Sequence, residues 1–202
     1  IGSVNTIVND GGKLTGHITD GIGFVRSLAY EGVELRGKKL VVLGAGGAGT
    51  AVQAQLALDG ARELSIFNAD DAFLDRARNT ARKLAKETPD CVVSVHQLED
   101  AARLAEEIAS ADILVNTTSV GMKPDDAKTL IDKSLLREGL VVADTVYNPE
   151  KTRLILEAEA NGCKVVGGKG MLLWQGATAY KLYTGLDMPT AECQKFQASQ
   201  AR

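Results

Sequence analysis

A glycine cluster is the most informative chemical feature of the 202-residue chain. The run Gly44-Ala45-Gly46-Gly47-Ala48-Gly49 follows the apolar stretch 40–43 and precedes a helical pattern at 51–58. Glycines between a strand and a helix let the backbone turn tightly and let a pyrophosphate approach without a Cβ in the way. The N-terminus of the following helix offers free N–H groups and a partial positive charge to the phosphates. The spacing therefore predicts a dinucleotide-binding turn.

Two acids stand where such a fold selects its dinucleotide. The predicted second strand, 63–67, leads into Asn68-Ala69-Asp70-Asp71. A carboxylate at this point binds the ribose hydroxyls of NAD, whereas an arginine pairs the extra phosphate of NADP. The nearest arginine, Arg76, lies a turn into the following helix, and two carboxylates repel a phosphate. The sequence thus favours NAD over NADP. A plainer interpretation is that Asp70 is the N-cap of that helix, and the two acids can also share the work, one capping the helix and one contacting the ribose.

The elements that must position these residues alternate along the chain. After Gly37 we expect strands at 40–43, 63–67, 92–96, 113–116, 140–144 and 164–166, and helices at 50–59, 72–87, 99–109 and 151–161. Such alternation predicts an α/β fold, a Rossmann-like doubly wound parallel sheet with crossover helices. Strands at 1–9 and 14–18 and a helix at 21–30 precede it, and helices at 171–183 and 191–198 follow. Gly60 and Gly162 are expected C-terminal helix caps.

Composition narrows the classes of partner. The chain is 45% hydrophobic and carries a net charge of −3 without a long run of either sign, which argues against nucleic-acid or membrane partners. Cys91, Cys163 and Cys193 are widely spaced and are expected to be reduced thiols, which favours a cytoplasmic location. With His17 and His96 as the two histidines, no metal site is expected.

Several segments in order resemble shikimate dehydrogenases, most closely the quinate/shikimate dehydrogenase branch. Beyond the glycine cluster, they are Gly2-Ser3-Val4-Asn5-Thr6, 16–23, 116–122, 144–149 and 168–177. The surroundings of Cys163 and 172–175 point to the quinate/shikimate branch. The resemblance covers almost the whole chain. It implies a reversible hydride transfer between a nicotinamide cofactor and a ring hydroxyl of shikimate or quinate.

The resemblance also implies roles for particular residues. Asp20 matches the aspartate of a catalytic Lys–Asp pair, and the residues expected at the substrate are Asn5, Asp20, Tyr147 and Gln175. The residues expected at the cofactor are Gly44, Ala45, Gly46, Gly47, Ala48, Asn68, Asp70, Asp71, Thr117, Ser119, Val146, Tyr147 and Gly168. Two of these keep a plainer interpretation: Tyr147 as a turn aromatic, and Gln175 as a polar residue on a helix face.

Three departures from the family pattern matter. Ile18 stands where the family has Asn, which removes one polar group near the site. Asn68-Ala69-Asp70 replaces the Asn-Arg-Thr or Asn-Arg-Arg of NADP-using or dual-specificity relatives, in agreement with the charge argument. The catalytic lysine of the family precedes the Asn5 segment, and Lys13 matches nothing in the pattern. We therefore expect the chain to bind nucleotide but to have little dehydrogenase activity by itself.

The resemblance also predicts a domain division. Residues 1–21 are expected to be the last part of a substrate domain whose beginning the chain lacks, 22–170 the dinucleotide-binding domain, and 171–202 helices that return to the substrate domain. Apolar faces left open by the missing part invite self-association, and relatives commonly form dimers.

Two other functions remain open. A non-catalytic nucleotide-binding module need not keep Asp20 and Gln175. A related dehydrogenase with another substrate, such as a glutamyl-type reductase, would share the glycine loop. It would not be expected to carry Asn5 and Thr19-Asp20-Gly21.

Overall fold

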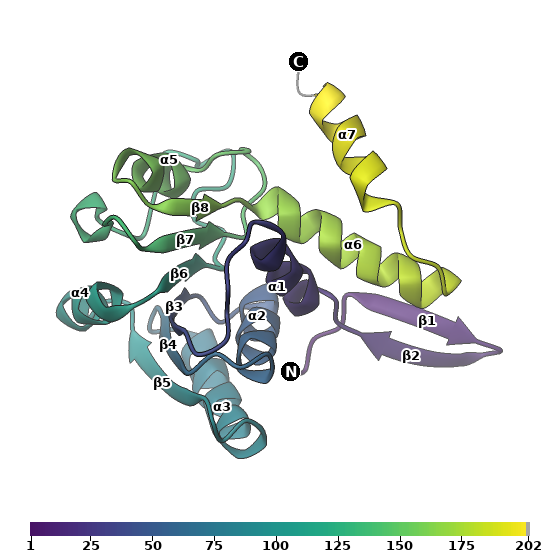
Figure 1. Cartoon of the computed structure of the whole chain (residues 1–202). Coiled ribbons are helices and arrows are strands. Elements are labelled where there is room, and N and C mark those ends of the chain that lie inside the picture. The colour runs from purple at the N-terminus through teal and green to yellow at the C-terminus, as the bar shows by residue number, and fades with distance from the viewer. Residues whose placement is uncertain (201–202) are drawn as a thin grey trace.

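A six-stranded parallel sheet forms the centre of the protein, as a computed structural model that describes residues 1–200 shows (Figure 1). The strand order is β5-β4-β3-β6-β7-β8. The bounds are Lys39–Leu43 for β3, Glu63–Asn68 for β4, Val92–Gln97 for β5, Ile113–Asn116 for β6, Val141–Asp144 for β7 and Lys164–Val166 for β8. The order reverses between β3 and β6, where a doubly wound sheet opens a crevice at its carboxyl edge. The predicted Rossmann-like fold is confirmed.

Both faces of the sheet are buried because each central strand is apolar throughout. Leu40 and Val42 face one side of β3, Val41 and Leu43 face the other, and none of the four is exposed. The register aligns Leu43 with Phe67 and with Asn116, so the carboxyl ends of β3, β4 and β6 meet at one edge. The side chains that follow these strands are therefore brought together.

Helices cover the sheet on both sides. On the side of Leu40 lie α1 (Asp20–Tyr30), α2 (Gly47–Leu58), α3 (Ala72–Glu87) and α6 (Gly168–Thr184). On the opposite side lie α4 (Ala101–Ser110), α5 (Arg153–Ala160) and the 3-10 turn η1 (Lys133–Leu135). Helix α1 packs along α6 and against α2, which brings the start of the chain to the carboxyl edge of the sheet.

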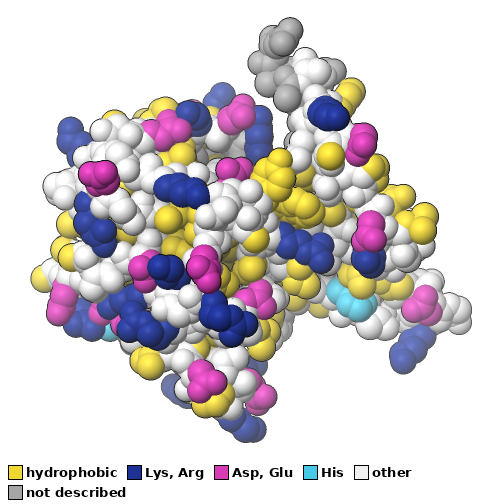
Figure 2. Space-filling model, viewed as in Figure 1, with side chains coloured by type: hydrophobic (Ala, Val, Ile, Leu, Met, Phe, Trp, Pro, Cys, Tyr) yellow, Lys and Arg dark blue, Asp and Glu magenta, His cyan; other side chains and the backbone are white. Residues whose placement is uncertain are grey.

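A hairpin stands apart from the main sheet (Figure 1). It consists of β1 (Thr6–Asp10) and β2 (Lys13–His17), with Gly11 and Gly12 at positive φ in the turn. The first strand begins at Thr6 rather than at residue 1, because residues 1–4 have no strand partner. Ile7 and Leu14 are 57% and 67% exposed, and Figure 2 shows further apolar side chains at the surface along α6.

The helix ends follow the predicted chemistry. Gly60 and Gly162 adopt φ values of +95° and +75° just beyond α2 and α5, which confirms both as C-terminal caps. Helix α2 begins at Gly47, three residues before the predicted start, because Gly46 serves as its N-cap. A last helix, α7, covers Thr190–Gln200. Within residues 1–200, no helix is long and apolar enough to cross a membrane.

Candidate active site

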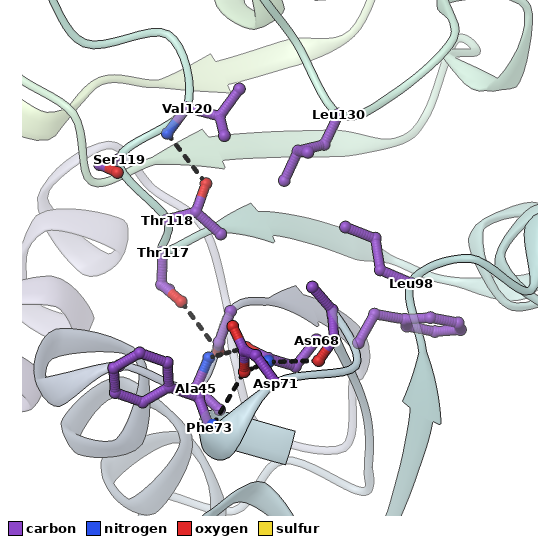
Figure 3. A pocket seen from close by; sticks show the side chains of 14 residues that line it. Ala45, Asn68, Asp71, Phe73, Leu98, Thr117, Thr118, Ser119, Val120 and Leu130 are labelled. Atoms are coloured by element: carbon purple, nitrogen blue, oxygen red, sulfur yellow. Dashed lines mark hydrogen bonds between the residues drawn. The ribbon is translucent and has the colours of Figure 1, made fainter.

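Two pockets adjoin the N-terminus of α2 at the carboxyl edge of the sheet. The first, named the glycine-loop pocket, has a volume of about 340 Å³ (Figure 3). It is lined by Gly44, Ala45, Gly46, Phe67, Asn68, Ala69, Asp71, Phe73, Leu98, Thr117, Thr118, Ser119, Val120 and Leu130. The second, named the Asp20 pocket, has a volume of about 200 Å³. It is lined by Asp20, Ala48, Thr145, Tyr147, Gly168, Met171, Leu172 and Gln175.

The glycine loop is held by the strands on either side of β3. Gly44 has a φ of +98°, and a Cβ there would lie 2.7 Å from Thr118 Cγ2, so glycine is needed for conformation and for space. Its N–H donates to the carbonyl of Phe67 in β4 at 2.8 Å. From the β6 side, the Thr117 hydroxyl donates to the carbonyl of Leu43 at 2.6 Å.

The start of α2 presents unpaired backbone donors. The N–H and the hydroxyl of Thr50 both donate to the carbonyl of Gly46 at 2.9 Å, which fixes the first turn. The N–H groups of Gly47 and Ala48 precede the first residue that can bond within the helix, so they stay available to an anion. Ala48 lines the Asp20 pocket, while Gly46 lines the glycine-loop pocket. One helix terminus therefore serves both pockets.

Asp71, rather than the Asp70 of the plainer interpretation, is the N-cap of α3, and it also lines the glycine-loop pocket. Its Oδ1 accepts from the N–H of Phe73 and from Asn68 Nδ2, both at 2.8 Å. Among the hydrogen bonds of the described residues, none involves its Oδ2. Asn68 in turn accepts the N–H of Ala45 at 2.9 Å. Both acids are exposed, but Asp70 lines neither pocket, so the pocket lining separates the two acids that the sequence left equivalent.

The apolar wall of the glycine-loop pocket was not predicted from the sequence. Phe67 is fully buried and its ring stacks on His96 with a centroid distance of 5.0 Å. Phe73, two residues beyond the Asp71 cap, is 46% exposed at the mouth. Leu98 and Leu130 come from loops distant in sequence. Phe73 could have been inferred from its place beside the cap, whereas the two leucines carry no local signal.

A hydrogen-bond network joins the hairpin segment to α1 and α6 beside the Asp20 pocket. Asn5 Nδ2 donates to Asp20 Oδ1 at 2.8 Å and to the Thr19 hydroxyl at 3.0 Å. That hydroxyl donates to Gln175 Oε1 at 3.2 Å across 156 positions of sequence. Thr19 is fully buried, so its position is fixed by packing. The predicted substrate residues Asn5, Asp20 and Gln175 are thus brought together.

The Asp20 carboxyl lies in a partly desolvated place. Burial raises its pKa, and the hydrogen bond from Asn5 partly offsets that rise. In the described part of the chain, no lysine or arginine forms an ion pair with Asp20. Lys13 lies at the tip of the hairpin, where the strand register places it opposite Asp10 and four residues before His17. Tyr147 lines the same pocket and is half exposed at its rim.

Asp144 is a buried carboxyl that anchors the loop carrying Tyr147. Its Oδ1 accepts from Asn116 Nδ2 at 3.0 Å and from the N–H of Val146 at 2.9 Å, and its Oδ2 accepts from Thr152 at 2.7 Å. Burial raises the pKa of Asp144 to about 6 although all three bonds favour the anion. Apart from the position of Asp144 in the 144–149 segment, nothing in the sequence indicated this role.

Gly168 is required where α6 begins. A Cβ there would lie 2.5 Å from the carbonyl oxygens of Thr145 and Val146, so only glycine permits this close approach. The Val146 side chain is buried and lines neither pocket, which leaves its backbone as the group able to contact a ligand. Gly47 also lines neither pocket, and the group that it offers to an anion is its backbone N–H at the start of α2. Within residues 1–200, no group of three His, Cys, Asp or Glu side chains is arranged to hold a metal ion.

The strand order, the glycine turn at a helix N-terminus and the crevice beside it define a dinucleotide-binding α/β protein. Comparison with protein families identifies the family within this class. The model of the shikimate/quinate 5-dehydrogenase family matches residues 27–135, and that of the shikimate 5'-dehydrogenase C-terminal domain matches residues 168–195. The chain belongs to the shikimate/quinate 5-dehydrogenase family.

Individual relatives agree with this assignment. A quinate/shikimate dehydrogenase of Escherichia coli O139:H28 is 50% identical over 190 residues, which cover 94% of this chain and 66% of the relative. The chain thus spans about two thirds of the length of this curated relative. A shikimate 5-dehydrogenase of Listeria monocytogenes, solved with shikimate and NAD, is 47% identical with a TM-score of 0.92, covering 97% of this chain and 68% of that one.

A quinate dehydrogenase of Corynebacterium glutamicum, solved with NAD, is 33% identical with a TM-score of 0.86, covering 98% of this chain and 68% of that one. Other solved members of the family hold NADP. Solved members of the family therefore hold either NAD or NADP.

Proposed function

We propose that this chain is the cofactor-holding part of an NAD-dependent quinate/shikimate dehydrogenase. The observation that carries the proposal is the shared helix terminus: the N-terminus of α2 borders both pockets through Gly46 and Ala48. A dinucleotide whose pyrophosphate lies on that terminus extends its adenosine into the glycine-loop pocket and its nicotinamide toward the Asp20 pocket. NAD, when bound, supplies the hydride acceptor for a ring alcohol.

The residues of the Asp20 pocket supply what a polyhydroxylated substrate needs. Tyr147 and Gln175 line the pocket and offer hydrogen-bonding groups that orient a ring bearing several hydroxyls, while Asn5 holds the Asp20 carboxylate beside it. The Asp20 carboxylate, whose pKa is raised by burial, is suited to hold and share the hydroxyl proton as the hydride leaves. Shikimate and quinate belong to this substrate class, and the names of the relatives support them.

The preference for NAD over NADP is assigned to Asp71. Its Oδ1 is engaged with the cap and with Asn68, while its Oδ2 is left to accept a ribose hydroxyl. A phosphate on that hydroxyl would face a carboxylate instead of a cation. Asp70, exposed and outside both pockets, is given no direct contact.

Calorimetric titration of NAD and NADP into matched variants tests this assignment. Asp71→Asn keeps the oxygen that caps α3 but loses the charge, so NAD affinity is expected to fall about tenfold and the preference over NADP to narrow. Asp70→Asn changes the same charge one residue away, with both affinities expected within about twofold of the wild type. The opposite pattern would assign the ribose contact to Asp70. Tighter binding of NADP than of NAD by the wild type would refute the preference itself.

We also propose a cytoplasmic location and a homodimeric assembly. The three cysteines, all free, suit a reducing compartment such as the cytoplasm. Exposed Ile7, Leu14 and Leu186 favour association into a homodimer. Sedimentation of the purified chain at several concentrations distinguishes a dimer from a monomer.

A further inference from the structure

Gln53 is a buried amide beneath the glycine loop with no role in the function described so far. It lies in α2, has no exposed surface, and donates from Nε2 to the carbonyl oxygen of Gly44 at 2.8 Å. Its Oε1 is buried without a hydrogen-bond partner among the described residues. A half-paired buried amide costs folding stability, and its neighbours Val52 and Ala54 are apolar. An apolar side chain would serve the core better, so the amide must be explained by something other than packing.

With the bond from Gln53, the Gly44–Ala45 peptide is hydrogen-bonded at both its carbonyl oxygen and its N–H. The Gly44 carbonyl accepts from Gln53 Nε2 at 2.8 Å, and the Thr117 hydroxyl, which donates to the Leu43 carbonyl, lies 3.2 Å from it. The N–H of the same peptide, contributed by Ala45, donates to Asn68 Oδ1 at 2.9 Å. A peptide held at its oxygen by α2 and at its nitrogen by β4 cannot rotate freely. The direction of the chain leaving it toward Gly46 is thereby set.

We propose that Gln53 is a positioning residue for the dinucleotide, which fixes the Gly44–Ala45 peptide and so the N–H groups at the start of α2. The inference rests on the proposed function, because those N–H groups are taken to hold the pyrophosphate. Donors fixed in place before binding lose little conformational freedom when the ligand arrives, so they increase its affinity. The unpaired Oε1 lowers the folding stability, while the Nε2 of the same amide fixes the loop before the ligand binds.

Replacement of Gln53 by methionine separates this role from a structural one. Met has a similar length, lacks the donor and removes the unpaired Oε1. We expect the dissociation constant for NAD to rise about fivefold, the equivalent of one neutral hydrogen bond, while the melting temperature stays unchanged or rises. Gln55→Met on the same helix is the matched control, since its amide bonds Asp59 and reaches no part of the loop. It should leave NAD affinity unchanged.

A purely structural Gln53 predicts the reverse, a lower melting temperature with unchanged NAD affinity, and that result would overturn the proposal. Gln53→Leu repeats the comparison with a smaller side chain if methionine overpacks the site.

A second measurement needs no cofactor. Amide hydrogen exchange at Ala45 reports on the bond to Asn68 at the other end of the peptide. Exchange there is expected to accelerate in Gln53→Met but not in Gln55→Met. If the wild-type chain failed to bind NAD, the proposed function would fall, and unchanged Ala45 exchange would separately refute the role of Gln53.

Discussion

The two pockets differ in how their walls are held. In the glycine-loop pocket, side chains at the ends of neighbouring strands bond the backbone of the loop and of β3, because Asn68 accepts the N–H of Ala45 and Thr117 donates to the carbonyl of Leu43. In the Asp20 pocket, the walls come from α1, the start of α2, the 145–147 loop and α6, and the bond from Thr19 to Gln175 spans 156 positions. The first pocket is attached to the rigid sheet, while the second depends on how helices pack beside it.

This difference indicates that the glycine-loop pocket serves cofactor binding and the Asp20 pocket serves substrate selection. A sheet edge with fixed register presents the same donors whatever lies around it, so it suits a cofactor common to many enzymes. A pocket made by helix packing and a hairpin segment can change its shape and its substrate without disturbing the sheet. We therefore expect changes in the glycine-loop pocket to affect cofactor affinity and folding together, and changes around Asp20 to affect its chemistry with smaller losses of stability.

The largest effect is expected from Gly44→Ala. The positive φ and the 2.7 Å approach to Thr118 Cγ2 together should reduce the free energy of unfolding by about 3–5 kcal/mol and abolish NAD binding. Urea denaturation and calorimetry measure the two losses. Gly46→Ala is the control for folding, since no atom lies within 4 Å of a Cβ there and its φ is −67°. A folded, NAD-binding Gly44→Ala protein would contradict the rigid-loop description.

Asp144 links the two regions and should make folding depend on pH. Because its folded pKa is about 6, the native state keeps a proton between about pH 4 and 6 that the unfolded chain has lost. Its contribution is therefore fully present below about pH 4, declines as pH rises to 6, and is constant above, for a total of up to roughly 3 kcal/mol.

Urea denaturation at a series of pH values, with Asp144→Asn as the comparison, isolates this contribution from that of Asp20. The amide can keep both Oδ1 bonds and donate to the Thr152 hydroxyl, so the variant should fold and show a flatter profile. Equal slopes in the two proteins would show that Asp144 titrates normally.

Thr19→Val tests the network beside Asp20. The nearly isosteric change removes the hydroxyl that donates to Gln175 and accepts from Asn5, which should cost about 1–2 kcal/mol of unfolding free energy. Cofactor affinity should stay within about twofold, because the glycine loop is held elsewhere. A large loss of NAD affinity would show that the two pockets are coupled more tightly than their hydrogen bonds indicate.

The smallest effect is expected from Asn5→Ala. Loss of the 2.8 Å bond to Asp20 Oδ1 removes a group that favours the charged carboxylate, so the pKa of Asp20 should rise further. Carbon-detected NMR titration of the Asp20 carboxyl measures the change, and Asn9→Ala in the hairpin turn, whose side chain bonds Gly12, is the control. An unchanged or lower pKa would remove Asn5 from the electrostatics of the site.

Much of the fold could be predicted because the strands are locally marked. The six apolar runs fell within a residue of the observed strands, since buried parallel strands are apolar throughout and are bounded by turns. The predicted start of the first strand, residue 1, was wrong. The strand begins at Thr6, because pairing with a partner decides where a strand begins. The domain division at residues 21 and 170 stays a prediction.

The parts of the site that could be predicted are those that need a particular backbone conformation, as in the glycine turn, or a charge at a fixed distance along the chain from that turn. The glycine turn, the parallel sheet and the acids that follow β4 could be inferred from the chain alone, because tight turns, apolar strands and charge are local properties. The folded protein was needed to show that Asp71 lines the pocket while Asp70 does not, that Leu98 and Leu130 complete its wall, and that Gln53 holds the Gly44 carbonyl. Those relations join elements distant in sequence, and only packing around the sheet fixes which side chains meet.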